Sequence, residues 1–208
     1  MSCASFVGDQ FRLFRTFAQA EGYGTSIAPE NCDIYSTLSV VPSNAAFQND
    51  PTSLEFYDSP STSIFVQVQD PIIRRGSQVP TQNLIGIAGV SLEIAWPAAP
   101  AAATDLETVL QVMTEGVFEL SIAGDRQYMA RGGSIINQTA STPASTAALD
   151  GLGPVAPAVT TLLPSTKIVM PGSTIRALLR IDGSAAVWQA VAGTIKTTLH
   201  LYCFNARR

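Results

Sequence analysis

The chain has 208 residues, a length at which one undivided β-sandwich or barrel is common. Apolar residues make up 46% of it and charged residues only 13%, about half the usual share of roughly 25%, which excludes a disordered chain and allows a sizeable core. The net charge of −4 and the scattered positions of the Lys and Arg residues argue against nucleic acid as a partner. So few charges also leave little repulsion between identical copies.

No targeting or membrane segment is predicted. Residues 1–20 contain no continuous apolar segment and include Asp9, Arg12 and Arg15, so they do not read as a signal peptide. No apolar run approaches the ~20 residues that a membrane span requires. The three cysteines are far apart and form no Cys-x-x-Cys pair, so we expect reduced thiols in a host cytoplasm and no zinc site.

Residues 1–27 are predicted to form an N-terminal arm. The spacing of Phe11, Phe14 and Phe17 fits one face of a helix that would end at Gly22. The alternation of apolar and basic residues within the same segment fits a strand equally well. In either case, we expect the aromatic face to be buried in its own domain or in a neighbouring subunit.

Residues 28–208 are predicted to be a single β domain. Residues 34–41 are a short strand candidate, and residues 63–69 alternate as a half-buried strand does. The segment between them, residues 42–62, is rich in Pro, Ser, Asn and Asp and is predicted to be a long loop. Residues 84–96 form the next strand. Two glycines inside that strand are expected to mark bends or bulges, Gly86 and Gly89.

One helix is predicted after a Pro/Ala connector. Thr104 and Glu107 match a capping box, apolar residues then follow at helical spacing, and Gly116 supplies the stop. Residues 117–122 return to strand, and a turn at Ala123-Gly124-Asp125 leads into residues 126–129.

The final part of the chain contains a second long loop and three strands. Residues 132–165 are Ser/Thr/Pro/Ala-rich and are predicted to be loop. A strand at 167–170 follows, and residues 174–181 and 194–201 are then predicted to pair as antiparallel neighbours beyond the Asp182-Gly183-Ser184 turn. Seven to nine strands with one or two short helices predict an all-β fold, an antiparallel β-sandwich of the jelly-roll type.

The sequence selects no catalytic, cofactor-binding or metal-binding residue. The only histidine, His200, stands in the last strand, and no Gly-x-Ser-x-Gly elbow offers a nucleophilic serine. The Gly-rich segments lack the lysine and the following helix of a phosphate loop. A hydrolase would need two carboxylates, and the sequence offers three candidate pairs, Glu107 with Glu115, Asp50 with Asp58, and Glu93 with Glu119, but nothing in their spacing selects one.

Two segments and the intervening loop resemble structural proteins of tailed bacteriophage particles. They are Gly-Val-Phe-Glu-Leu-Ser-Ile-x-Gly-Asp-Arg-x-Tyr at residues 116–128, and Ile-Val-Met-Pro-Gly-Ser-Thr-Ile-Arg at residues 168–176. The resemblance is one of pattern and composition over roughly residues 84–204. It implies a non-enzymatic virion component without a cofactor. The short, strand-rich chain favours a capsid cement, decoration or minor head protein over the main shell subunit, with a tail or head–tail connector component as the alternative.

The expected mechanism is assembly through subunit contacts. The expected partners are further copies of the chain, with a trimer favoured, and a major capsid or other virion protein; nucleic acid and membrane are not expected, and the expected location is the virion. A lectin-like glycan-binding module is the other alternative, with Trp96, Trp188 or Tyr57 as the stacking residue. The candidate subunit-contact residues are Phe6, Phe11, Phe14, Phe17, Trp96 and Trp188.

Overall fold

A computed structural model describes residues 3–23, 30–57, 68–69, 78–96, 103–141 and 160–207. The strands are β1 Glu30–Val40, β2 Thr52–Phe56, β3 Val68–Gln69, β4 Asn83–Trp96, β5 Val117–Ile122, β6 Asp125–Arg131, β7 Ile136–Ser141, β8 Thr161–Val169, β9 Ile175–Ile181 and β10 Ile195–Arg207. The helices are α1 Cys3–Ala20, α2 Ala103–Glu115 and α4 Ala186–Gln189, with 3₁₀ turns η1 Ala45–Phe47 and η2 Gly132–Ser134.

The strands form two sheets that enclose the main core. Sheet A has the order β3-β1-β10-β4-β7, with β8 paired to the other half of β4, and sheet B has the order β2-β9-β5-β6. Four antiparallel couples build both sheets: β1 with β10, β2 with β9, β4 with β8, and β5 with β6. Apart from the short β3 and β7, the first strand thus pairs with the last, the second with the last but one, and so on inward to the consecutive β5 and β6. This is the jelly-roll arrangement, and the predicted antiparallel sandwich is confirmed.

The predicted pairing of the last two strands is wrong. β9 lies in sheet B between β2 and β5, whereas β10 lies in sheet A between β1 and β4. The connection from Asp182 to Thr194 is not a hairpin turn, because it contains α4 and crosses from one sheet to the other. Trp188 in α4 is fully buried and donates its indole N–H to the Phe47 carbonyl at 2.9 Å, which fixes the crossing.

Both predicted long loops contain regular structure. Within 42–62, residues Thr52–Phe56 form β2, whose Leu54 and Phe56 are fully buried against the core. Within 132–165, η2, β7 and the first part of β8 are present. The sequence did not predict these strands, because they are short and lie among Pro, Ser and Asp residues. Their strand conformation comes from pairing, of β2 with β9 and of β7 and β8 with β4. Residues 58–67 and 142–159 lie outside the described part, as does most of the strand predicted at 63–69.

The arm is a helix that covers one end of the outer face of sheet A. Phe14, Ala18 and Tyr23 pack with Leu84, Ala88, Phe204 and Ala206 in a second apolar cluster. The Phe14 ring lies directly over Gly86, where a Cβ would come within 2.5 Å of it. Gly86 is therefore needed for the close approach of helix and strand, while the predicted bulge falls between Ile87 and Gly89.

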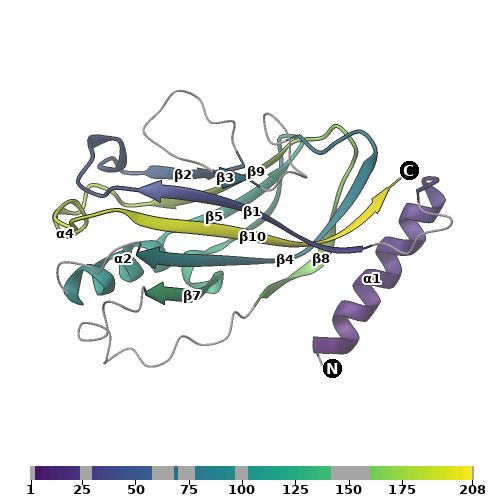
Figure 1. Cartoon of the computed structure of the whole chain (residues 1–208), viewed down its shortest axis with the longest axis horizontal. Coiled ribbons are helices and arrows are strands. Elements are labelled where there is room, and N and C mark those ends of the chain that lie inside the picture. Colours follow the sequence, from purple (N-terminus) through teal and green to yellow (C-terminus); the bar gives the residue numbers. More distant parts are fainter. Residues whose placement is uncertain are drawn as a thin grey trace.

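The end of α1 follows from Gly22, as predicted. Gly22 has φ +78°, and its N–H donates to the Gln19 carbonyl while Tyr23 N–H donates to that of Ala18. The side chain of Tyr23, directly after this glycine, is buried in the second apolar cluster. Figure 1 shows α1 at one end of the sandwich and α2 with α4 at the other. The aromatic face of the arm is thus buried within its own chain at Phe14 and partly at Phe11, while Phe17 stays exposed.

Replacing Phe14 by Ala should lower the free energy of unfolding by about 3 kcal/mol, because Phe14 is 1% exposed and its removal leaves a cavity over Gly86. Phe17→Ala is the matched control; its side chain is 37% exposed, so a cost below about 1 kcal/mol is expected. Urea denaturation measures both values. Equal, small effects would show that α1 does not belong to the folded domain.

Candidate functional site

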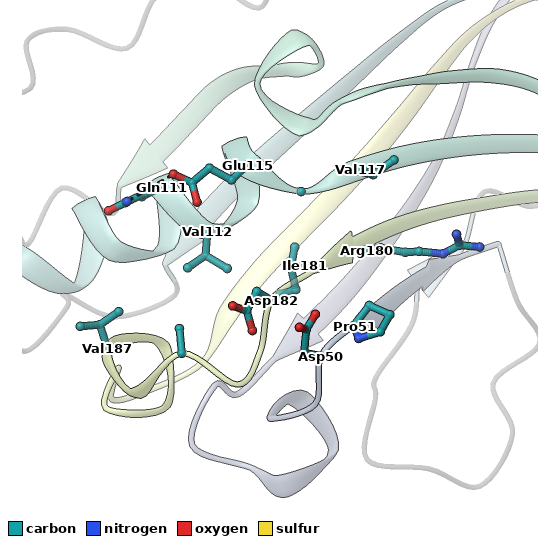
Figure 2. A pocket seen from close by; sticks show the side chains of 12 residues that line it. Asp50, Pro51, Gln111, Val112, Glu115, Val117, Arg180, Ile181, Asp182 and Val187 are labelled. Atoms are coloured by element: carbon teal, nitrogen blue, oxygen red, sulfur yellow. Dashed lines mark hydrogen bonds between the residues drawn. The ribbon is translucent and has the colours of Figure 1, made fainter.

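A pocket of about 520 Å³ opens at the end of the sandwich that carries α2 and α4. Its lining residues come from α2, the start of β5, the end of β9, the segment that leads into α4, α4 itself and the turn before β2: Asp50, Pro51, Gln111, Val112, Glu115, Gly116, Val117, Arg180, Ile181, Asp182, Ala185 and Val187. Figure 2 shows Gln111 and Glu115 on α2 above the pocket, and Asp50 and Asp182 with their carboxylates below it. The pocket thus has apolar walls and an acidic mouth.

The local sequence of α2 explains its side of the pocket. Val109 and Met113 are fully buried toward the main core, which turns Gln111 and Glu115 outward. The helix begins at Ala103, so Thr104 stands in its first turn and not before it as the capping box predicted. It ends before Gly116, as predicted.

Local hydrogen bonds favour the ionised form of one acid of the pocket, Asp182. Asp182 accepts hydrogen bonds from the Ser184 hydroxyl at 2.6 Å and the Ser184 backbone N–H at 2.9 Å, which lower the pKa of Asp182. Glu115 accepts from the Gln111 amide at 3.3 Å. The Arg180 side chain extends away from Asp182 along the outer face of sheet B, where it lies 3.4 Å from Glu119. A general acid needs a raised pKa, so Asp182 is suited to attract a cationic group instead.

The pocket brings together acids that none of the three sequence pairs combined. Asp50 and Glu115 line the same pocket although each was paired with another residue, and Asp182 was not considered. Asp58 lies outside the described residues. Glu93 and Glu119 lie on different sheets, in β4 and β5.

His200 lies on the outer face of sheet A. Its Nε2 is 3.7 Å from Glu93, and its ring lies beside those of Tyr35 and Tyr202, with centroids 6.2 and 6.3 Å away. Among the residues whose placement is described, no three His, Cys, Asp or Glu side chains gather in a way that could hold a metal ion. His200 is therefore part of an aromatic row on a sheet surface.

A second depression of about 460 Å³ lies between α1 and β8. It is bounded on the helix by Leu13, Phe14 and Phe17, and on the strand by Pro164 and Ile168. Leu13 is 66% exposed and Phe17 37%, although both are large apolar side chains. The outward face of α1 therefore offers an apolar stripe, Leu13 and Phe17, beside a groove.

The candidate contact residues fall into three groups. Phe14 and Trp188 are buried inside the chain, so their side chains are covered without a partner. Phe11 is half-buried and packs edge-on against Phe204 at 5.2 Å, and Phe17 is exposed on the rim of the α1 groove. The side chains of Phe6 and Trp96 lie outside the described part.

The aromatic residues suggested for glycan stacking are also largely internal. Tyr57 is fully buried, and its hydroxyl lies 2.9 Å from the carbonyls of Ile34 and Leu199. With Trp188 buried as well, two of the three predicted platform residues cannot stack on a sugar. The row of Tyr35, His200 and Tyr202 was missed, although alternation in the two strands, once aligned, places all three on one face.

No protein-family model matches the chain, and no curated protein matches it. None of the helices in the described segments has the length and apolarity to cross a bilayer.

The lowered pKa of Asp182 predicts a specific pH dependence. The folded state favours ionised Asp182. The contribution of Asp182 to the free energy of unfolding is therefore complete above its unfolded pKa, near 3.8, and is lost as the pH falls below that value. The difference in unfolding free energy between the wild type and Asp182→Asn should be constant near neutral pH and shrink below pH 3.8. Chemical denaturation across this range measures it, and Ser184→Ala should raise the pKa of Asp182 in an NMR titration. An unchanged pKa in that variant would contradict the assignment.

Proposed function

We propose that this chain is a non-enzymatic structural subunit of a bacteriophage virion, a capsid cement, decoration or minor head protein that works by subunit contacts. The observation that carries the proposal is the exposed Leu13–Phe17 stripe of α1, a helix packed on the outside of a jelly roll. Jelly rolls serve in viral capsids as well as in lectins and metal-binding enzymes. The resemblance of residues 84–204 to tailed-phage structural proteins supports the first of these uses.

The α1 stripe has the properties of a docking surface. Leu13 and Phe17 are four residues apart and so lie one above the other on the helix. The helix itself is fixed by the second apolar cluster and by Gln10, whose amide donates to the Leu163 carbonyl at 3.0 Å. A surface that is already ordered loses little conformational freedom on binding. The groove beside the stripe can receive an apolar side chain of a major capsid protein or of another copy.

Replacing both Leu13 and Phe17 by Asp should abolish stoichiometric uptake of the protein by candidate phage shells, because charge would have to be buried in the contact. The fold should persist, since both side chains are exposed in the isolated chain. Co-sedimentation with purified shells measures uptake, and circular dichroism checks the fold.

The matched control is Gln19→Asp, an exposed position on the other flank of α1. It should bind shells like the wild type. Equal uptake of the wild type and the Leu13/Phe17 variant would remove α1 from the contact. No uptake of the wild type by any shell would count against the virion role.

Glycan binding is the second candidate, favoured by the row of Tyr35, His200 and Tyr202 on sheet A. Rings spaced by about 6 Å on a flat strand surface can stack against sugars. Saturable binding on a glycan array that is lost in Tyr202→Ala would establish it.

A further inference from the structure

The outer face of sheet B gathers four of the twelve basic residues of the chain. Arg126 and Arg131 come from β6, and Arg176 and Arg180 from β9. The strand register places them around β5, with Val117 opposite Arg131 and Arg180, and Ser121 opposite Arg126 and Arg176. The sequence showed no such cluster, because the arginines are up to 54 positions apart.

Two glutamates organise this arginine face. Glu119 is only 9% exposed, and one of its oxygens lies 3.5 Å from Arg126 and 3.4 Å from Arg180. Glu55 pairs with Arg176. The guanidinium-bearing side chains of Arg126 and Arg180 remain 59% and 43% exposed, so they are positioned but still available to a partner.

The face is also apolar between its charges. Met129 and Val117 are exposed on it, and Leu178, paired with Glu119, is 4% exposed. Arg and Met enriched over a buried apolar floor are typical of protein–protein interfaces. Single-stranded nucleic acid is bound instead by aromatic side chains along a basic groove. In the described strands of sheet B, no Phe, Tyr or Trp lies on this face.

The charge of the rest of the chain is complementary. The arginine face carries four positive and two negative charges in a chain of net charge −4, so the remaining surface is more acidic than the whole. The acidic pocket with Asp50, Glu115 and Asp182 directly adjoins the face, and the two share Val117 and Arg180. Each copy therefore presents a basic and an acidic patch side by side.

We propose that two copies of this chain pair about a two-fold axis through the shared boundary, each setting its arginine face on the acidic pocket of the other. In such an isologous contact every interaction is made twice. Val117, 40% exposed, would meet its own equivalent near the axis. The inference rests on the proposed assembly function and identifies one of its contacts, separate from the α1 stripe.

Charge reversal at two exposed positions tests the contact. Arg131→Glu on the face and Glu115→Lys at the pocket should each weaken self-association about tenfold, measured by sedimentation at low and moderate salt. Lys at the C-terminal end of α2 is favourable to the helix, so folding should persist. The double variant, which restores opposite charges, should recover dimerisation, and an equimolar mixture of the single variants should form a mixed dimer.

Lys196→Glu, an exposed position on β10 in sheet A, is the matched control. It should associate normally. The double variant that combines Lys196→Glu with Glu115→Lys should stay weakened, although its net charge equals that of the rescued double variant.

Wild-type association that neither single variant changes would overturn the inference while leaving assembly intact. A wild type that is monomeric but taken up by shells would also overturn the inference alone; a monomer ignored by shells would overturn both. Competition by a single-stranded oligonucleotide that is lost in Arg131→Glu would assign the face to nucleic acid instead.

Discussion

The structure depends on β10, which pairs along its length with β1 on one side and β4 on the other. Its inward side chains fill the main core, whereas Phe204 and Ala206 at its end face outward under α1. Since a slip of one residue would exchange these two sets, the register of β10 is strongly specified. The register of β10 fixes the position of β4. In turn, β4 provides Gly86, on which the Phe14 ring packs, and the edge with which β8 pairs.

Local patterns were sufficient for most of the elements. The alternation in residues 84–96, the turn at Ala123-Gly124 and the glycine stop at Gly22 each express a constraint that acts within a few residues. The helical spacing of α2 was likewise readable. These elements appear in the structure close to where the sequence places them. In each of them, the residues that favour the local conformation are also the residues that the fold buries or turns.

Pairing between distant segments was not readable. The two similar segments at 174–181 and 194–201 were assigned to each other, but in a jelly roll the last strands pair with the first ones. The chain crosses from sheet B to sheet A between these two segments, and the crossing is held by Trp188, whose indole N–H donates to the Phe47 carbonyl. Likewise, β2 has too little apolar pattern of its own and gains its order from β9.

The surfaces that carry the functional proposals could be predicted only in part. The Phe spacing in α1 indicated an amphipathic arm, but only packing separates buried Phe14 from exposed Phe17. The acidic pocket and the arginine face are products of topology, because Asp50, Glu115 and Asp182 come from three distant segments. The arginine face is the outer side of sheet B, whereas α1 packs on sheet A, so a subunit can make two different contacts at once.

The central claim is that this chain functions by assembling. The most direct measurement is its mass in solution by light scattering over a wide range of concentration, alone and after mixing with candidate shells. The account predicts a species at a multiple of the 22.0 kDa chain mass, or mass transferred stoichiometrically to the shell. A single species of 22.0 kDa at every concentration, with no transfer to shells, would contradict it.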